Sequence, residues 1–205
     1  VVAVDIGGMK FDEADRSSTQ FNPLLAKAGQ GSPSNPIKLA EMGDPNGLNH
    51  AAFPFLSKST GNFYIVGGDE TFPWGVMATK GQPSNPRGGF HFLNFTDPDN
   101  PKEDAVYQVP EAGSHNMWVY DDVLMAAFYQ GGLRVVDISG ELLGDIYNQG
   151  REIAVYQSSH KEGKIPNAPM VWGAQPYKDY IFFADMNSGL YCIQLEDLEK
   201  GPGAP

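Results

Sequence analysis

The sequence predicts an all-β fold, a propeller-like stack of about three four-stranded blades that form a partial or open ring with few short helical turns. Two observations carry this prediction. A stretch of the chain repeats itself without a gap, and short apolar segments alternate with Gly-rich or Asp-rich turns. The composition agrees, because 24 Gly, 16 Pro and 41% hydrophobic residues in 205 are typical of a folded, turn-rich domain.

The internal repeat is the strongest of these signals. Residues 115–138 align without a gap with residues 172–195, so that Tyr120 and Tyr177 are 57 residues apart. Each copy has a strand, a tight polar turn, a second strand, a Gly turn and a third strand. Four short strands per unit, repeated, are typical of propeller blades. An ordinary β-sandwich with a chance similarity is the alternative.

The repeat divides the chain into predicted units. Candidate fourth strands, 105–109 and 152–156, complete the first two blades. Asn22-Pro23 and Asn35-Pro36 each place Asn before Pro, which favours short helical turns. The divisions are residues 1–6 as the end of a preceding blade, 7–49 as an irregular excursion, 50–200 as the blades (50–109, 110–156 and 165–198) and 199–205 as a tail. We expect the excursion either to pack on a blade face or partner, or to form a surface loop.

The pattern of apolar residues predicts which strands are covered on one face and which on both. Residues 123–129 and 180–184 are continuously apolar, which predicts strands covered on both faces. Residues 132–138 alternate, which predicts unequal faces. Cys192 lies within an apolar strand, and we expect a buried, inert thiol.

Residues 131–139, Gly-Gly-Leu-Arg-Val-Val-Asp-Ile-Ser, are echoed at 1–6 and 90–101. This pattern resembles the LVIVD-repeat β-propellers over roughly residues 45–200. The third copy departs from it, with Gln194 in place of Asp, and no Asp-Pro turn follows the second. The resemblance implies a scaffold, not a reaction. It also implies a bacterial protein that is periplasmic or extracellular, although no signal segment is visible and we expect the true N-terminus to lie upstream.

Charge and cysteine content exclude several classes. Lys plus Arg is 14 and Asp plus Glu is 25, a net charge of −11. Nucleic-acid binding depends on cationic side chains, so no nucleic-acid partner is expected. No apolar run approaches the roughly 20 residues of a membrane-spanning helix. One cysteine permits no intrachain disulfide and no multi-cysteine metal centre.

Two histidines hold equivalent repeat positions. His50 and His115 each come just before the first strand of a unit, near the expected central channel, and Trp172 takes that place in the third. We expect them to bond the backbone of a neighbouring blade, with no metal and no cofactor. The competing hypothesis is a metal-dependent propeller enzyme that uses both imidazoles. A third is a ligand site that uses Trp118, Trp172 and Tyr177 near the channel. Of the other two histidines, we expect His91 to face outward from its strand and His160 to be solvated.

Aromatic residues in an insertion give the best hint of a partner. Phe72, Trp74 and Met77 lie between Gly68 and Gly88, and large apolar side chains on a loop make effective interface anchors. The same loop could instead fold over its own blade. An incomplete ring would also expose blade faces. The sequence therefore predicts a non-catalytic, extrinsic scaffold subunit that docks onto other protein subunits of a larger, possibly membrane-bound complex.

Overall fold

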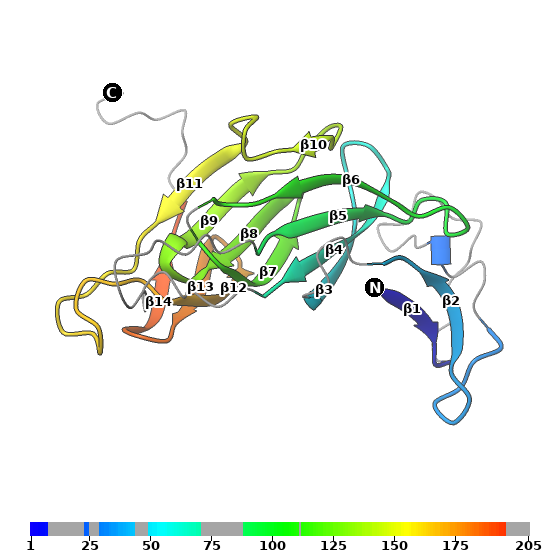
Figure 1. Ribbon diagram of the computed structural model, residues 1–205, viewed down its shortest axis with the longest axis horizontal. Helices are drawn as coiled ribbons and strands as arrows, with labels where there is room; N and C mark the ends of the chain where they lie inside the picture. Colours follow the sequence, from blue (N-terminus) through cyan, green and yellow to red (C-terminus); the bar gives the residue numbers. More distant parts are fainter. Residues whose placement is uncertain (8–22, 25–28, 44–48, 71–87, 111, 196–205) are drawn as a thin grey trace, which may run out of the picture.

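The computed structural model describes residues 1–7, 23–24, 29–43, 49–70, 88–110 and 112–195. Over these residues the fold is all-β, as predicted, with four sheets of two to five strands (Figure 1). The helical content of this part of the chain is limited to short 3-10 turns. None of its helical segments has the length and apolarity needed to cross a membrane.

Sheet 1 is a two-stranded antiparallel sheet of β1 (Val2–Asp5) and β2 (Ile37–Glu41). The helical turn predicted from Asn35 is wrong. Asn35 instead forms an isolated bridge with Ser32, and the alternating residues that follow pair with β1. Residues 7–49 are therefore not wholly irregular. The turn predicted from Asn22 falls largely outside the described residues.

Sheet 2 is an antiparallel meander of four strands, with a short fifth strand added in parallel at the edge beside β6. It contains the predicted blade 50–109, including its fourth strand. Its strands are β3 (Asn49–Leu56), β4 (Phe63–Asp69), β5 (Phe90–Asn94), β6 (Lys102–Tyr107) and the added β10 (Gly144–Asp145).

Sheet 3 repeats the meander with four strands, which run in the order β11, β9, β8, β7. A single 3-10 turn, η2 (Tyr129–Gly131), joins the second strand to the third. The predicted fourth strand at 152–156 is confirmed. The strands are β7 (Ser114–Tyr120), β8 (Val123–Phe128), β9 (Gly132–Asp137) and β11 (Glu152–Tyr156).

Sheet 4 consists, among the described residues, of three antiparallel strands, β12 (Val171–Tyr177), β13 (Tyr180–Asp185) and β14 (Gly189–Ile193). Its pairing register reproduces that of sheet 3 with the predicted spacing. Met125 faces Val135 across β8 and β9, and 57 residues later Phe182 faces Cys192 across β13 and β14.

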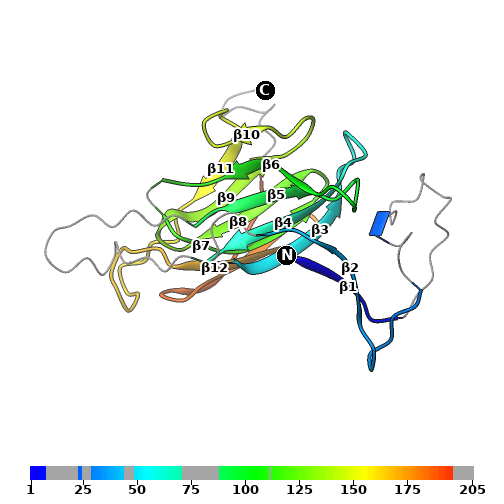
Figure 2. The ribbon, with the colours of Figure 1, turned by 45° about the vertical axis from the view of Figure 1, so that its right-hand side comes forward.

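The four sheets are stacked side by side (Figure 2). An apolar cluster fills each junction between them. Phe90 and Phe92 of sheet 2 meet Leu124 and Ala126 of sheet 3 in the largest cluster. Sheets 3 and 4 share a second cluster, and sheets 1 and 2 share a third. Sheet 3 is therefore covered on both faces, whereas sheets 1 and 4 lie at the two ends of the stack.

This stacking corrects three predictions. The strand at 180–184 is covered on one face only, because Ile181 and Phe183 are buried while Tyr180 and Ala184 are exposed. In contrast, β9 is buried on both faces except at Asp137, because sheet 3 lies between two others. Cys192 is exposed, since it lies on the uncovered face of sheet 4.

Candidate functional site

A polar cluster gathers where the first strands of three sheets meet. His50, His115 and Trp172 are the second residues of β3, β7 and β12, so the repeat gives them equivalent places. Contacts join β7 to both β3 and β12. The imidazole centroids lie 4.4 Å apart, and the His115 ring lies 5.0 Å from the Trp172 ring. The structure therefore brings these three positions together.

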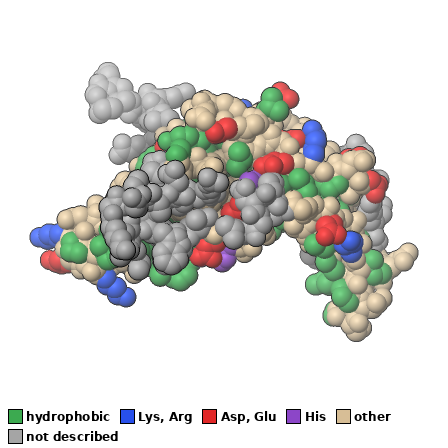
Figure 3. All heavy atoms as spheres, in the orientation of Figure 1, with side chains coloured by type: hydrophobic (Ala, Val, Ile, Leu, Met, Phe, Trp, Pro, Cys, Tyr) green, Lys and Arg blue, Asp and Glu red, His purple; other side chains and the backbone are tan. Residues whose placement is uncertain are grey.

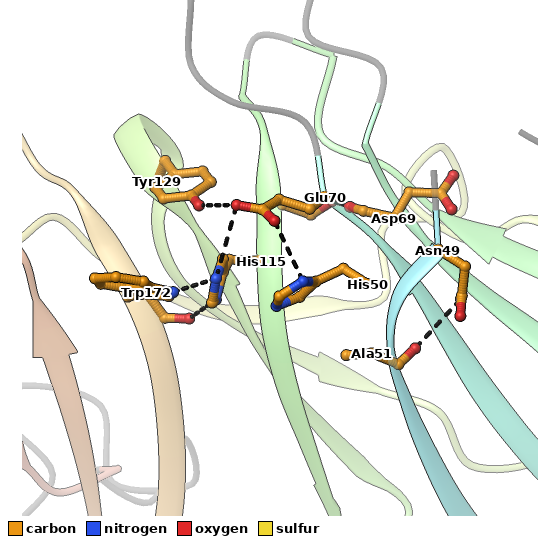
Figure 4. Close-up of polar contacts among 9 residues, drawn as sticks. Asn49, His50, Ala51, Asp69, Glu70, His115, Tyr129 and Trp172 are labelled. Atoms are coloured by element: carbon orange, nitrogen blue, oxygen red, sulfur yellow. Dashed lines mark hydrogen bonds and ion pairs between the residues drawn. The ribbon is translucent and has the colours of Figure 1, made fainter. Parts of the chain in front are cut away.

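Glu70, which directly follows β4, lies between the two histidines (Figure 4). Its Oε2 is 3.2 Å from His50 Nδ1, and its Oε1 is 3.8 Å from His115 Nε2. The Tyr129 hydroxyl donates a hydrogen bond of 2.5 Å to the same Oε1. Burial, reinforced by this hydrogen bond, raises the pKa of Tyr129, so the phenol remains a donor at neutral pH.

The surroundings of His115 fix its tautomer. Its Nδ1 is 2.7 Å from the carbonyl oxygen of Trp172, so Nδ1 carries the proton and donates. Nε2 then carries the lone pair and accepts the indole N–H of Trp172. Burial lowers the pKa of His115, and the nearby His50 lowers it further. The hydrogen bond to the Trp172 carbonyl and the charge of Glu70 act in the opposite direction and raise this pKa. The ring is consequently neutral at pH 7. The expected bond from a histidine to the backbone of a neighbouring sheet is present here.

The other residues proposed for the channel do not join this cluster. Trp118 packs against Phe53, with ring centroids 5.1 Å apart, and Tyr177 is exposed at the opposite end of β12. The sequence analysis missed Glu70. Its signal was available, because antiparallel pairing places the end of a second strand beside the start of the first. Phe72, Trp74 and Met77 lie outside the described residues.

A second polar group, around His91, overturns the prediction that this side chain faces outward. His91 is buried, with Nε2 3.0 Å from Asp69 Oδ2 and Nδ1 2.6 Å from Glu103 Oε1. Burial acts to lower the pKa of His91, but the bond to Glu103 and the charge of Asp69 outweigh it and raise the pKa. β5 is buried along its whole length, because sheets 1 and 3 cover the two faces of sheet 2, so its polar residue needs internal partners.

An exposed apolar face closes the stack at sheet 4. Four residues of sheet 3 that contact sheet 4 are buried, namely Met125, Ala127, Leu133 and Val135. Their counterparts 57 residues later lie on the opposite face of sheet 4 from the buried Ile181 and Phe183. Of these counterparts Leu190 is 76% exposed, Ala184 and Cys192 are exposed, and Phe182 is half-buried. We call these four residues the terminal face.

Sheet 1 ends the stack on the other side in a similar way. Val1 and Ala3 pack against sheet 2, whereas Val2 and Val4, which alternate with them, are about half exposed. We call Val2 and Val4 the leading face. On the side of the molecule drawn in Figure 3, the basic side chains are few and widely separated, so the described surface gathers no basic patch there.

Comparison with known proteins adds no further assignment. No family model matches the chain, and neither a curated protein nor a solved structure does so. The resemblance to LVIVD-repeat propellers therefore rests on the quoted residues alone.

Proposed function

We propose that this protein is a non-catalytic scaffold subunit of a larger assembly, and that it joins other subunits through the terminal face. The single observation that carries the proposal is the exposure of Leu190. Its counterpart in sheet 3, Leu133, is fully buried by the next sheet. Equivalent repeat positions bind a neighbouring sheet at each of the three junctions. In sheet 4 the same positions are exposed, with no described sheet against them.

The occupant that fits the terminal face is another β-sheet with an apolar face. All three junctions inside the chain are of sheet on sheet, so the twist and side-chain spacing of this surface suit that partner. The chain carries such a sheet itself, because Val2 and Val4 are uncovered on sheet 1, beside their cross-strand partners Glu41 and Lys38, which form an ion pair. We therefore assign the terminal face of one copy to the leading face of a second copy, which continues the stack.

This contact is heterologous, since two different surfaces meet. Repeated around an axis it would close a propeller-like ring, which agrees with the blade-like meanders of sheets 2 and 3. The role needs no reaction at the polar cluster. On this proposal the chain acts as a structural segment whose ends recruit further subunits.

The experiment is to measure the mass of the protein by sedimentation velocity over a range of concentrations, together with two variants. Leu190→Asp places a charge on the terminal face, and Val4→Asp places one on the leading face. We expect the unsubstituted chain to self-associate and each variant alone to be monomeric. A mixture of the two variants should form dimers and nothing larger, because each variant keeps one intact face.

Leu143→Asp is the matched control, since Leu143 is 66% exposed and lies outside both faces. It should associate like the unsubstituted chain. The proposal is wrong if the unsubstituted chain is monomeric throughout, if Leu143→Asp disrupts as strongly as Leu190→Asp, or if the mixed variants stay monomeric.

A further inference from the structure

We propose that His50, Glu70 and His115 form a binding site for one divalent first-row transition-metal ion, for which Zn²⁺ is the best fit. The inference is independent of the scaffold role, because all three side chains belong to one copy. Two imidazole nitrogens and one carboxylate oxygen are a common ligand set for Zn²⁺ sites that keep a fourth position open.

The spacing of the ligand atoms suits a single ion. One atom from each of the three residues lies within 4.8 Å of the others. Two metal bonds of about 2.1 Å at the tetrahedral angle separate their ligand atoms by about 3.4 Å. The distance from Glu70 Oε2 to His50 Nδ1 is 3.2 Å and that from Glu70 Oε1 to His115 Nε2 is 3.8 Å, so each carboxylate oxygen lies near that separation from one imidazole. Small side-chain rotations would therefore bring the set to coordinating distance.

The candidate ligands already make the supporting hydrogen bonds that are typical of metal ligands. A ligating histidine typically donates its other ring N–H to a carbonyl or carboxylate, and His115 donates to the Trp172 carbonyl. A ligating carboxylate is itself hydrogen-bonded, and Tyr129 donates to Glu70. Access is open on one side, since the His50 and Glu70 side chains are each about one-third exposed while that of His115 is buried.

Among the residues that the structure describes, the Trp172 indole is the group that must move. Its N–H occupies the lone pair of His115 Nε2, the atom that would bind the ion. The side chain is 41% exposed, so the indole can rotate into solvent without opening a cavity. Binding of an ion is therefore coupled to displacement of a fluorophore, which gives the site its own optical signal.

The test titrates purified, metal-free protein with Zn²⁺ by calorimetry and with Co²⁺ by visible absorption, after circular dichroism has shown that each variant is folded. We expect one ion per chain and a change in Trp172 fluorescence. Loss of an outer hydrogen bond such as that of Tyr129 costs roughly 10–100-fold in metal affinity, so His50→Ala and Glu70→Gln, which remove a ligand, should cost more. Glu70→Gln keeps the side-chain shape, which protects the test if the alanine variant fails to fold.

Two further variants separate this site from nonspecific binding. Trp172→Phe removes the competing N–H, and we expect it to bind Zn²⁺ about two- to tenfold more tightly, the equivalent of one hydrogen bond, with no change in fluorescence. His160→Ala, in an exposed loop, should bind like the unsubstituted chain. The proposal is overturned if the unsubstituted chain binds no stoichiometric ion, or if both Glu70→Gln and His50→Ala bind as tightly as His160→Ala.

Discussion

Replacement of His91 by leucine tests whether the buried polar group of sheet 2 stabilises the fold. Leucine has a similar volume but no donor, so the Asp69 carboxylate, with 1% of its side chain exposed, loses the cation 3.0 Å away. Breaking a buried ion pair from one side typically costs about 3–5 kcal/mol, because the remaining charge stays desolvated. In a chain of this length we expect a fall in melting temperature of roughly 6–20 °C.

The assay is equilibrium unfolding in urea, in which the transition midpoint should fall while its slope stays constant. Lys38→Ala is the control. It breaks the Lys38–Glu41 pair of 2.6 Å, whose side chains are more than half exposed, and should leave the midpoint unchanged. The reasoning is refuted if the His91→Leu variant loses less than about 1 kcal/mol, the value of an exposed ion pair.

The pH dependence gives a second, independent check on His91. Because its pKa is raised in the folded protein, the charged ring contributes its full stabilisation below about pH 6.5, the unfolded value. That contribution disappears as the pH rises through the higher folded pKa. The stability difference between the unsubstituted chain and the His91→Leu variant should therefore shrink as the pH rises above about 6.5. A difference that grows over this range would contradict the assigned charge state.

Four more outcomes follow from single positions. Asp122 is buried, has a φ of 54° and accepts hydrogen bonds from the 57–59 turn; Asp122→Ala should cost about 2–4 kcal/mol in denaturant unfolding, and Asp122→Asn less, since Asn tolerates this backbone region. Gly132→Ala should cost at least about 2 kcal/mol in the same assay, because its φ is 78° and a Cβ would lie 2.4 Å from the Tyr156 carbonyl oxygen. Gly140→Ala, at a φ of 70° in open space, should cost about 1 kcal/mol. Cys192 should react with a thiol reagent in the folded protein without denaturant, and protection of the thiol at high protein concentration would indicate that the terminal face is covered.

The sequence was most informative where order along the chain decides the structure. The 57-residue repeat predicted the strand order and pairing of sheets 3 and 4, because hairpin registers follow from local turns and alternation. Prediction from the sequence failed where the burial of a side chain depends on packing against a distant part of the chain. Neither the burial of His91 nor the exposure of Cys192 can be inferred from the strand itself, since each depends on whether another sheet covers that face.

The candidate site was likewise predictable only in part. The repeat placed His50 and His115 at equivalent positions, and the structure brings them together. The repeat does not predict the acid at Glu70, because the equivalent position in sheet 3 holds Tyr129, the residue that hydrogen-bonds to it. One repeat thus supplies the Glu70 carboxylate, and the next repeat supplies, from the equivalent position, the Tyr129 hydroxyl that donates a hydrogen bond to it. A site built from equivalent positions in adjacent repeats needs only single substitutions to acquire a carboxylate and a supporting phenol, because stacking already brings those positions within reach of one another.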